Sequence, residues 1–317
     1  MKETETTLAK TISVAGVNAA YDNACKRILS DKNILAWIMK SCLPEYKTCS
    51  VDEIAANYIE GEPQISDIAV HQDEQKNSSR IQGMNTEDAS INEGTVTYDI
   101  RFYALAPVSG ERIRLIINVE AQNDFYPGYP VVKRNIYYCS RLISSQHGTE
   151  FEGSHYEQIK KVYSIFICME PPKYRRNTIN CYSIQEENVI GNAKEKKENY
   201  DLMTAVMLCL GVKDDEEVSG ILRLLEVLLS SERNAEEKKK ILQEEYGIEM
   251  TKKLDKEVSE MCNLSKGVEA RGIQKGIQKG ILSSIQTLMV TMSWTVEQAM
   301  DALKIPKEDR IKYLEKL

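Results

Sequence analysis

Two carboxylates and an amide offer the clearest chemistry in this sequence: Asp99, Glu120 and Gln122. They lie in two segments rich in β-branched and aromatic residues, TVTYDIRFYALA at 95–106 and ERIRLIINVEAQ at 111–122. The turn-forming residues PVSG separate the two segments, which predicts an antiparallel hairpin. Because strand side chains alternate between the two faces of a sheet, Glu120 and Gln122 share one face.

The register of this hairpin decides whether the two acids can meet. A symmetric turn pairs Ala106 with Glu111, which sets Asp99 opposite Asn118 and diagonal to Glu120. Diagonal neighbours on one face lie roughly 7–8 Å apart at Cα, so both carboxylates can reach one divalent cation. Magnesium prefers such oxygen ligands, and it lowers the pKa of bound water and neutralises charge on a phosphate. The alternative is that both acids lie on an ordinary solvated strand face.

The elements around the hairpin indicate a first domain. Apolar residues at helical spacing predict helix within 18–44, and SVDE at 50–53 predicts the capped start of another helix. The polar stretch 71–94 is expected to be a loop. After the hairpin, VVKRNIYYCSRLISS predicts a helix with Val132 and Ile136 on its apolar face, and KKVYSIFICM predicts a buried strand.

A charged run, QEENVIGNAKEKKEN, follows at 185–199. It predicts a first domain at 1–185, a linker at 186–199 and an all-helical module at 200–317, whose first helix is LMTAVMLCLG. The module contains a short repeat, GIQKGIQKGI, which begins at Gly272. Its Gly/Ile face suits a homo-oligomer contact between helices, and a flexible connector explains the same residues equally well.

Composition narrows the class of protein and its partners. No run of about 18 apolar residues is present and the N-terminus lacks a basic and apolar leader, so we expect a cytoplasmic protein with no membrane partner. Eight scattered cysteines without a CxxC pair are expected to be reduced and mostly buried. The formal charge of −7 argues against a nucleic-acid partner, yet residues 131–176 carry eight basic and four acidic side chains.

The strings YDIRF, NVEAQ, RNIYYCSRLISSQ and IKKVYSIFIC, taken in this order, resemble the PD-(D/E)XK nuclease family transposases, relatives of the Rpn recombination-promoting nucleases. The resemblance runs from about Asn33 to Tyr182, and the Gly-repeat tail is also similar to such proteins. It implies an α/β fold with a restriction-endonuclease-like αβββαβ core. It also implies a DNA endonuclease that hydrolyses phosphodiesters with Mg²⁺, or with Mn²⁺ in its place.

Carried over to this sequence, the resemblance makes Asp99 and Glu120 the metal-binding acids and the carbonyl of Ala121 a backbone ligand. Gln122 occupies the position of the family's lysine. A lysine would polarise the attacking water with a full charge, whereas an amide can only orient it. Lys133 and Lys161 are therefore candidates for the missing charge.

The predicted helix after the hairpin also offers DNA contacts. Arg134, Tyr138 and Arg141 fall on the face opposite its apolar residues, where a basic and aromatic row suits phosphate contact. Lys133 at the start of this helix and Gln146, which the resemblance implies as a residue lining the site, complete the expected DNA-binding set. The alternative for the row is a solvated face with ordinary ion pairs.

Two functions remain open from the sequence. The first is a metal-dependent DNA endonuclease of a transposase or recombination-promoting type. The alternative is a catalytically weak or inactive nuclease-like module that binds DNA or a protein. The intact acids favour the first function, and Gln122 favours the second.

Overall fold

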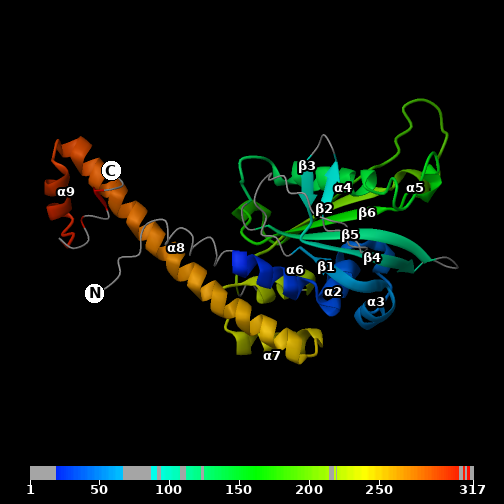
Figure 1. Cartoon of the computed structure of the whole chain (residues 1–317), viewed down its shortest axis with the longest axis horizontal. Helices are drawn as coiled ribbons and strands as arrows, with labels where there is room; N and C mark the ends of the chain where they lie inside the picture. The colour runs from blue at the N-terminus through cyan, green and yellow to red at the C-terminus, as the bar shows by residue number, and fades with distance from the viewer. Residues whose placement is uncertain are drawn as a thin grey trace. The chain divides into compact units, whose positions relative to one another are not determined.

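The structure, a computed structural model, describes residues 19–66, 87–90, 94–107, 112–122, 125–213, 218, 220–306, 310 and 313–314. The chain divides into two compact units, residues 1–262 and 263–317. The first unit holds every strand among the described residues, and the described part of the second unit is helical (Figure 1). A mixed α/β fold with a helical C-terminal region is therefore confirmed.

A six-stranded mixed sheet forms the centre of the first unit, with the strand order β1-β4-β5-β6-β8-β7. Strands β5, β6 and β8 run parallel to one another, and the other three pair antiparallel with their neighbours. A separate two-stranded sheet contains β2 and β3. The bounds are β1 Ile59–Ile65, β2 Glu87–Ser90, β3 Gly94–Thr97, β4 Ile100–Pro107, β5 Arg112–Gln122, β6 Val162–Cys168, β7 Thr178–Ser183 and β8 Met203–Cys209.

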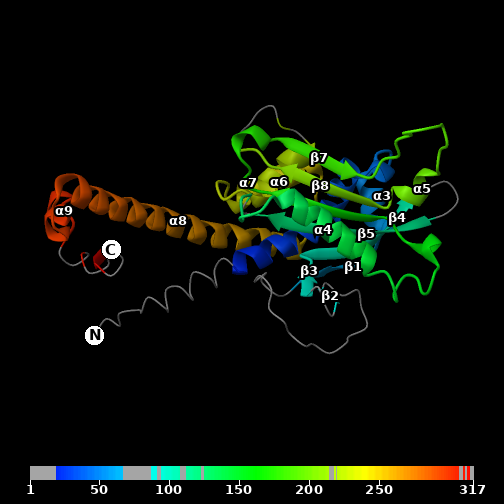
Figure 2. The same cartoon turned by 90° about the horizontal axis from the view of Figure 1, so that it is seen from above.

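Helices cover both faces of the six-stranded sheet (Figure 2). Helix α4 packs on one face against β6 and β8, and the N-terminal helices lie on the other face. Asp31 separates the first two helices, because its side chain caps the second by accepting from the N–H groups of Asn33 and Ile34. The bounds are a helix over 19–29, then α2 Lys32–Cys42, α3 Val51–Asn57, α4 Val131–Ser144, α5 Lys197–Tyr200, α6 Gly220–Leu229 and α7 Ala235–Tyr246, with short 3-10 turns η1 Pro44–Tyr46, η2 Tyr156–Gln158 and η3 Lys173–Arg175.

The hairpin of β4 and β5 has a different register from the predicted one. Ala106 pairs with Ile113, because Pro107 continues the strand and pairs with Arg112. The predicted pairing with Glu111 was wrong by two residues. A shift of two residues keeps each side chain on its face, and it moves Asp99 from opposite Asn118 to the level of Glu120.

The predicted strand 95–106 is interrupted. Its first part, β3, belongs to the small sheet, and β4 begins only at Ile100. Tyr98 and Asp99 form the break between them and lie in neither strand. Strict alternation therefore fails here, and both side chains are buried. Of the predicted loop 71–94, β2 contradicts residues 87–90, and 71–86 and 91–93 lie outside the described residues.

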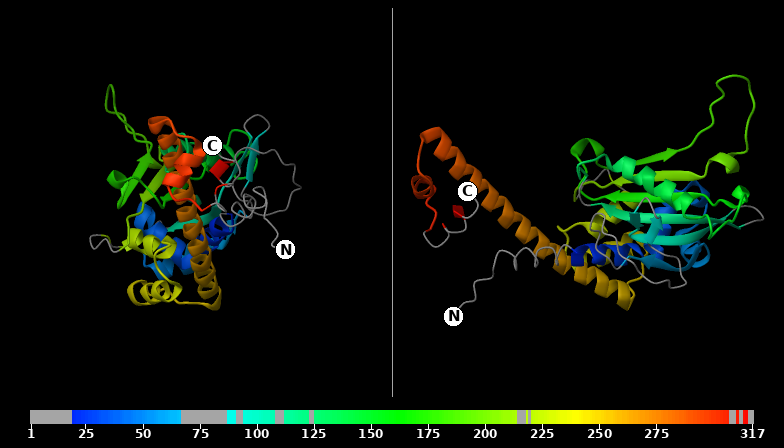
Figure 3. Two further views of the ribbon diagram at one scale, coloured as in Figure 1. Left: turned by 90° about the vertical axis from the view of Figure 1, so that its left-hand side faces the viewer. Right: turned by 45° about the horizontal axis from the view of Figure 1, so that its top comes forward.

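The predicted domain boundary at 186–199 differs from the observed one. Residues 186–199 are an exposed connection between β7 and β8 (Figure 3). The segment LMTAVMLCLG, predicted as a helix, contains β8, which lies in the sheet between β6 and β7. A parallel strand buried on both faces is apolar throughout, so its sequence cannot be distinguished from a short buried helix. The two compact units separate only after Cys262.

The C-terminal unit has a small core of its own, where the end of α8 (Lys252–Met292) meets α9 (Val296–Ala302). Its buried residues are Ile285, Ala299, Met300, Ile305 and Tyr313. The GIQKGIQKGI repeat is helical within α8, and most of its side chains lie outside the described residues. A homo-oligomer contact there stays a prediction.

Two further sequence predictions concern the cysteines and the membrane. All eight cysteines are free thiols, and all but Cys181 are buried, as predicted. Across the described part of the chain, no helix combines the length and the hydrophobicity that a bilayer crossing requires.

Candidate active site

The two predicted acids meet at the C-terminal end of β5. The N–H of Asp99 donates to Oε1 of Glu120 at 3.0 Å, and the N–H of Ala121 donates to Oδ2 of Asp99 at 3.2 Å. Asp99 is 3% exposed and Glu120 is 1% exposed. The predicted shared face is therefore confirmed, and the alternative of a solvated strand face is wrong for both acids.

Two cations neutralise most of this negative charge. Lys26, in the helix over 19–29, places Nζ 3.0 Å from Oδ1 of Asp99 and 2.8 Å from Oδ2 of Asp22. Arg134, in α4, places Nη2 3.5 Å from Oε2 of Glu120. The site is a buried cluster of three acids and two cations, held by elements on both sides of the sheet.

Gln122 belongs to the same cluster. Its Oε1 accepts a hydrogen bond of 3.0 Å from Nη1 of Arg134. The same Nη1 donates to the hydroxyl of Tyr129 at 3.5 Å, in the loop that leads from β5 to α4. Arg134 therefore links the end of β5 to the exposed loop beside it.

Burial dominates the electrostatics of the pair. It raises the pKa of Glu120 well above the ordinary value, and the neighbouring Asp99 carboxylate raises it further, while Arg134 opposes the rise. Burial also raises the pKa of Asp99, and the charge of Lys26 offsets part of that rise. Two interacting carboxylates without water resist double ionisation. Another cation beside the two carboxylates would therefore lower their pKa and favour loss of a bound proton.

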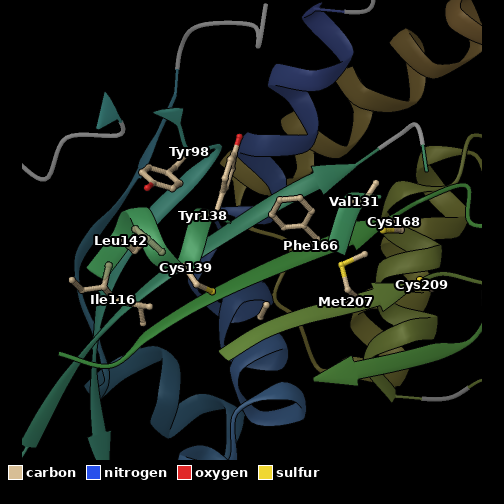
Figure 4. Close-up of a cluster of buried hydrophobic side chains, with 12 residues drawn as sticks. Tyr98, Ile116, Val131, Tyr138, Cys139, Leu142, Phe166, Cys168, Met207 and Cys209 are labelled. Atoms are coloured by element: carbon tan, nitrogen blue, oxygen red, sulfur yellow. The ribbon is translucent and has the colours of Figure 1, made fainter. Parts of the chain in front are cut away.

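Three aromatic rings of the buried core lie close to one another at the sheet and helix that carry Glu120 and Arg134 (Figure 4). Tyr98, Tyr138 and Phe166 form a chain of edge-to-face contacts with centroid distances of 5.4 and 5.6 Å. The guanidinium of Arg134 lies 5.1 Å from the centroid of Tyr138 and 5.3 Å from that of Phe166. These contacts orient the guanidinium beside Glu120 in surroundings of low polarity, where its charge acts strongly.

The predicted orientation of α4 is only partly right, because Val132 packs against the core as predicted. Arg134, Tyr138 and Arg141 were expected on a face that contacts DNA, and they face the sheet instead, while Ile136 is exposed. Val131, Tyr138 and Leu142 pack into the core from this side of the helix, and Arg134 reaches Glu120 from the same side. An apolar residue in place of Arg134 would leave the Glu120 carboxylate without its cation.

Two of the residues predicted to bind DNA differ in their exposure. Lys133 is exposed at the start of α4 and stays available for DNA. Arg141 is buried, and its guanidinium donates to the hydroxyl of Tyr137 at 3.2 Å, so it does not lie on an open DNA-binding surface.

Two further predicted residues lie at the opposite end of the sheet from the acids. Gln146 exchanges hydrogen bonds of 2.8 and 2.9 Å with the backbone of Lys160, just before β6 begins. Lys161 pairs with Glu45 at 3.1 Å and with Asp201 at 2.8 Å. Lys161 therefore cannot supply charge to a site at the C-terminal end of β5, and Gln146 does not lie beside the acids.

Lys26 and Asp22 were not predicted as site residues. Their spacing places them one helical turn apart, which in sequence is typical of an ordinary ion pair on a helix surface. Lys26 is fully buried, and the acid that it meets, Asp99, is remote in sequence. The sequence gives no clear signal for Lys26, because polar residues, among them Asn23 and Arg27, surround it in the same helix.

The donor set suits a divalent cation in part. Asp99 and Glu120 supply adjacent carboxylates, and the peptide of Ala121 lies beside them. The raised pKa of both acids is what a nearby cation would relieve. Against this, Lys26 and Arg134 already occupy carboxylate oxygens. Among the described residues, no cluster of three or more His, Cys, Asp or Glu side chains is arranged as a metal site.

Comparison with known proteins gives no independent indication of function. No family model matches the sequence, and neither a curated protein nor a solved structure matches the chain. The geometry of the site and the resemblance of its motifs are therefore the features that bear on function.

Proposed function

We propose that this protein is a metal-dependent DNA endonuclease of the PD-(D/E)XK type, acting in transposition or recombination. The observation that carries the proposal is the pair of adjacent buried carboxylates with raised pKa, one from the residue before β4 and one near the end of β5. Burying two acids together is costly, and perturbed acids of this kind gather at functional sites. The order helix, β1, β4, β5, α4, β6 supports a restriction-endonuclease-like core.

In the proposed enzyme, different residues of the cluster bind the metal, orient water and supply positive charge. Asp99, Glu120 and the Ala121 carbonyl would hold Mg²⁺ or Mn²⁺, which when bound lowers the pKa of water and neutralises phosphate charge. Gln122 orients the attacking water through its amide. Lys26 and Arg134 supply the positive charge that a lysine at position 122 would carry, and each already lies against one of the acids.

A second function has one observation in its favour. The acids, Lys26 and Arg134 form a cluster of nearly balanced charge, in which the carboxylates already pair with cations of the chain. A relative that lost catalysis would keep such a cluster as scaffold and would bind DNA or a protein through its surface. Cleavage assays separate the two functions.

The test is nicking of supercoiled plasmid in magnesium, in manganese and in chelator. We expect the wild type to nick with metal only, and Asp99→Asn to lose at least about a hundredfold in rate because it removes a ligand charge. Gln122→Ala should retain part of the activity. Asparagine is chosen over alanine because Asp99 is buried against Lys26, and the amide keeps an oxygen beside the lysine, which truncation would leave with Asp22 alone.

The matched control is Asp52→Asn, which changes an exposed acid in α3. It should nick like the wild type. Thermal unfolding of each variant separates loss of the site from loss of the fold. Equal nicking by wild type and Asp99→Asn would show that the assigned site is wrong, and no nicking in either metal would favour the non-catalytic function.

A further inference from the structure

Three exposed tyrosines gather beside the site, and we define them as the tyrosine surface: Tyr126, Tyr129 and Tyr174. Tyr126 and Tyr129 lie in the loop from β5 to α4, and Tyr174 lies in η3 after β6. The hydroxyls of Tyr126 and Tyr174 are 3.4 Å apart, so the two loops meet. Both loops follow the C-terminal ends of parallel strands, which is the edge of the sheet that carries the acids.

The tyrosine surface contributes little to the folded core. The side chain of Tyr126 is 65% exposed and that of Tyr174 is 73% exposed. Single exposed apolar residues are common on proteins, but grouped aromatic rings mark interaction sites. Ring faces that water can reach are therefore available to a flat partner.

Positive charge accompanies these rings. The segment 169–177 carries Lys173, Arg175 and Arg176 against the single acid Glu170, in a chain whose formal charge is −7. The guanidinium of Arg175 lies 5.8 Å from the ring centroid of Tyr174. A polyanion with flat rings matches both features, since phosphates pair with the cations and bases stack on the aromatics.

The tyrosine surface connects directly to the site. Arg134 donates from the same Nη1 to Tyr129 and to Gln122. A nucleotide stacked in the loop would therefore place its neighbouring phosphate close to Glu120. In an intact duplex the base faces are covered by their neighbours, so tyrosine rings cannot stack on them.

We infer that the tyrosine surface binds unpaired nucleotides of single-stranded DNA next to the cleaved phosphate. This inference rests on the proposed function and adds a substrate class to it. The protein then prefers single strands, or duplexes with an unpaired segment, to a fully paired duplex.

The test is fluorescence anisotropy with labelled DNA, in chelator so that no cleavage occurs. The probes are a single strand, a duplex with an internal unpaired segment and a fully paired duplex. We expect Tyr126→Ala with Tyr174→Ala to weaken single-strand binding by at least about tenfold, because each stacked base contributes roughly 1–3 kcal/mol. Binding to the paired duplex should change little. The corresponding double change to phenylalanine should keep single-strand affinity, because the ring does the stacking.

The matched control is Tyr156→Ala. Its side chain is 64% exposed, and it lies in η2 before β6, away from the C-terminal end of β5. Unchanged single-strand affinity in the alanine pair would overturn the inference, and so would an equal loss in Tyr156→Ala. Tighter binding of an RNA strand of the same sequence would overturn the assignment to DNA. Because binding is measured without metal, a protein that fails to nick can still confirm this surface, and one that nicks can still refute it.

Discussion

At the residue scale, Asp99 and Glu120 differ from ordinary strand acids because neither is in contact with bulk water. Their charge depends on Lys26 and Arg134, which approach from different helices. Removing one partner of such a buried pair should lower the free energy of unfolding by more than the intact pair adds to it, since the remaining charge is left uncompensated. The same few side chains therefore affect both the stability of the fold and the chemistry proposed for the site.

The pH dependence of stability follows from Glu120. Its pKa is raised in the folded protein from an ordinary value of 4.5, so the folded state binds its proton more tightly than the unfolded state. The free energy of unfolding should therefore fall as pH rises above about 4.5, by up to about 1.4 kcal/mol per pH unit for one proton. Glu120→Gln should remove much of this slope, leaving the smaller contribution of Asp99, whose pKa is also raised.

The measurement is urea denaturation in chelator between about pH 4.5 and pH 8, the range in which a raised carboxyl pKa acts. Glu152→Gln is the control, because Glu152 is exposed, and it should keep the wild-type slope. Stability of the wild type that rises with pH over this range would contradict the raised pKa of Glu120.

At the element scale, the beginning of α4 and the residues after its end make different contacts with the sheet. Its first turns carry Arg134 over the acids, and the residues after its end fix the start of β6. Between these two regions, the side chain of Asn135 donates a hydrogen bond of 2.9 Å to the carbonyl of Val206 in β8. Arg134 and Asn135 therefore face the sheet and contact its strands, although Lys133 between the loop and these residues is exposed.

Gln146 tests this division. Gln146→Ala should lower the free energy of unfolding by roughly 1–3 kcal/mol, because it leaves the backbone N–H and carbonyl of Lys160 without their partner. DNA affinity should not change, since Gln146 lies away from the acids. The measurements are urea denaturation and anisotropy, with the exposed Gln158→Ala as control. Weaker DNA binding at unchanged stability would restore the original assignment of Gln146 to DNA.

At the scale of the whole molecule, the two units have separate cores. Helix α8 contributes Leu254, Val258 and Met261 to the first unit, and Ile285 belongs to the core of the second. One continuous helix thus serves two cores along its length. Stability of the first unit should depend only on the beginning of α8.

Truncation tests this dependence. A chain that ends at Leu264 should unfold within a few degrees of the full chain, because it keeps the buried residues of α8 that belong to the first unit. A matched chain that ends at Thr251 loses Leu254, Val258 and Met261, and burial of such side chains contributes roughly 1.5–3 kcal/mol each. Thermal unfolding followed by circular dichroism distinguishes the two chains. An equal fall in unfolding temperature in both truncated chains would mean that the second unit also stabilises the first.

The sequence by itself determined the local elements and the identity of the acids. Strand periodicity and the turn residues indicated the hairpin, and a shift of two residues in its register left Asp99 and Glu120 on a shared face. Helix signals were equally local, as with Ser50, which accepts from the N–H of Glu53, and Gly247, whose positive φ ends α7.

Only the tertiary structure decided what surrounds the acids. Lys26 meets Asp99 across a large sequence separation, and nothing in its own neighbourhood specifies that partner. The inward face of α4 combines apolar residues of the core with Arg134, whose contact with Glu120 joins segments that the helix pattern alone does not relate. Residues 203–209 became a strand because β6 and β7 offered hydrogen-bonding edges on both sides. Each of these outcomes depends on contacts between distant segments, and local patterns carry no information about such contacts.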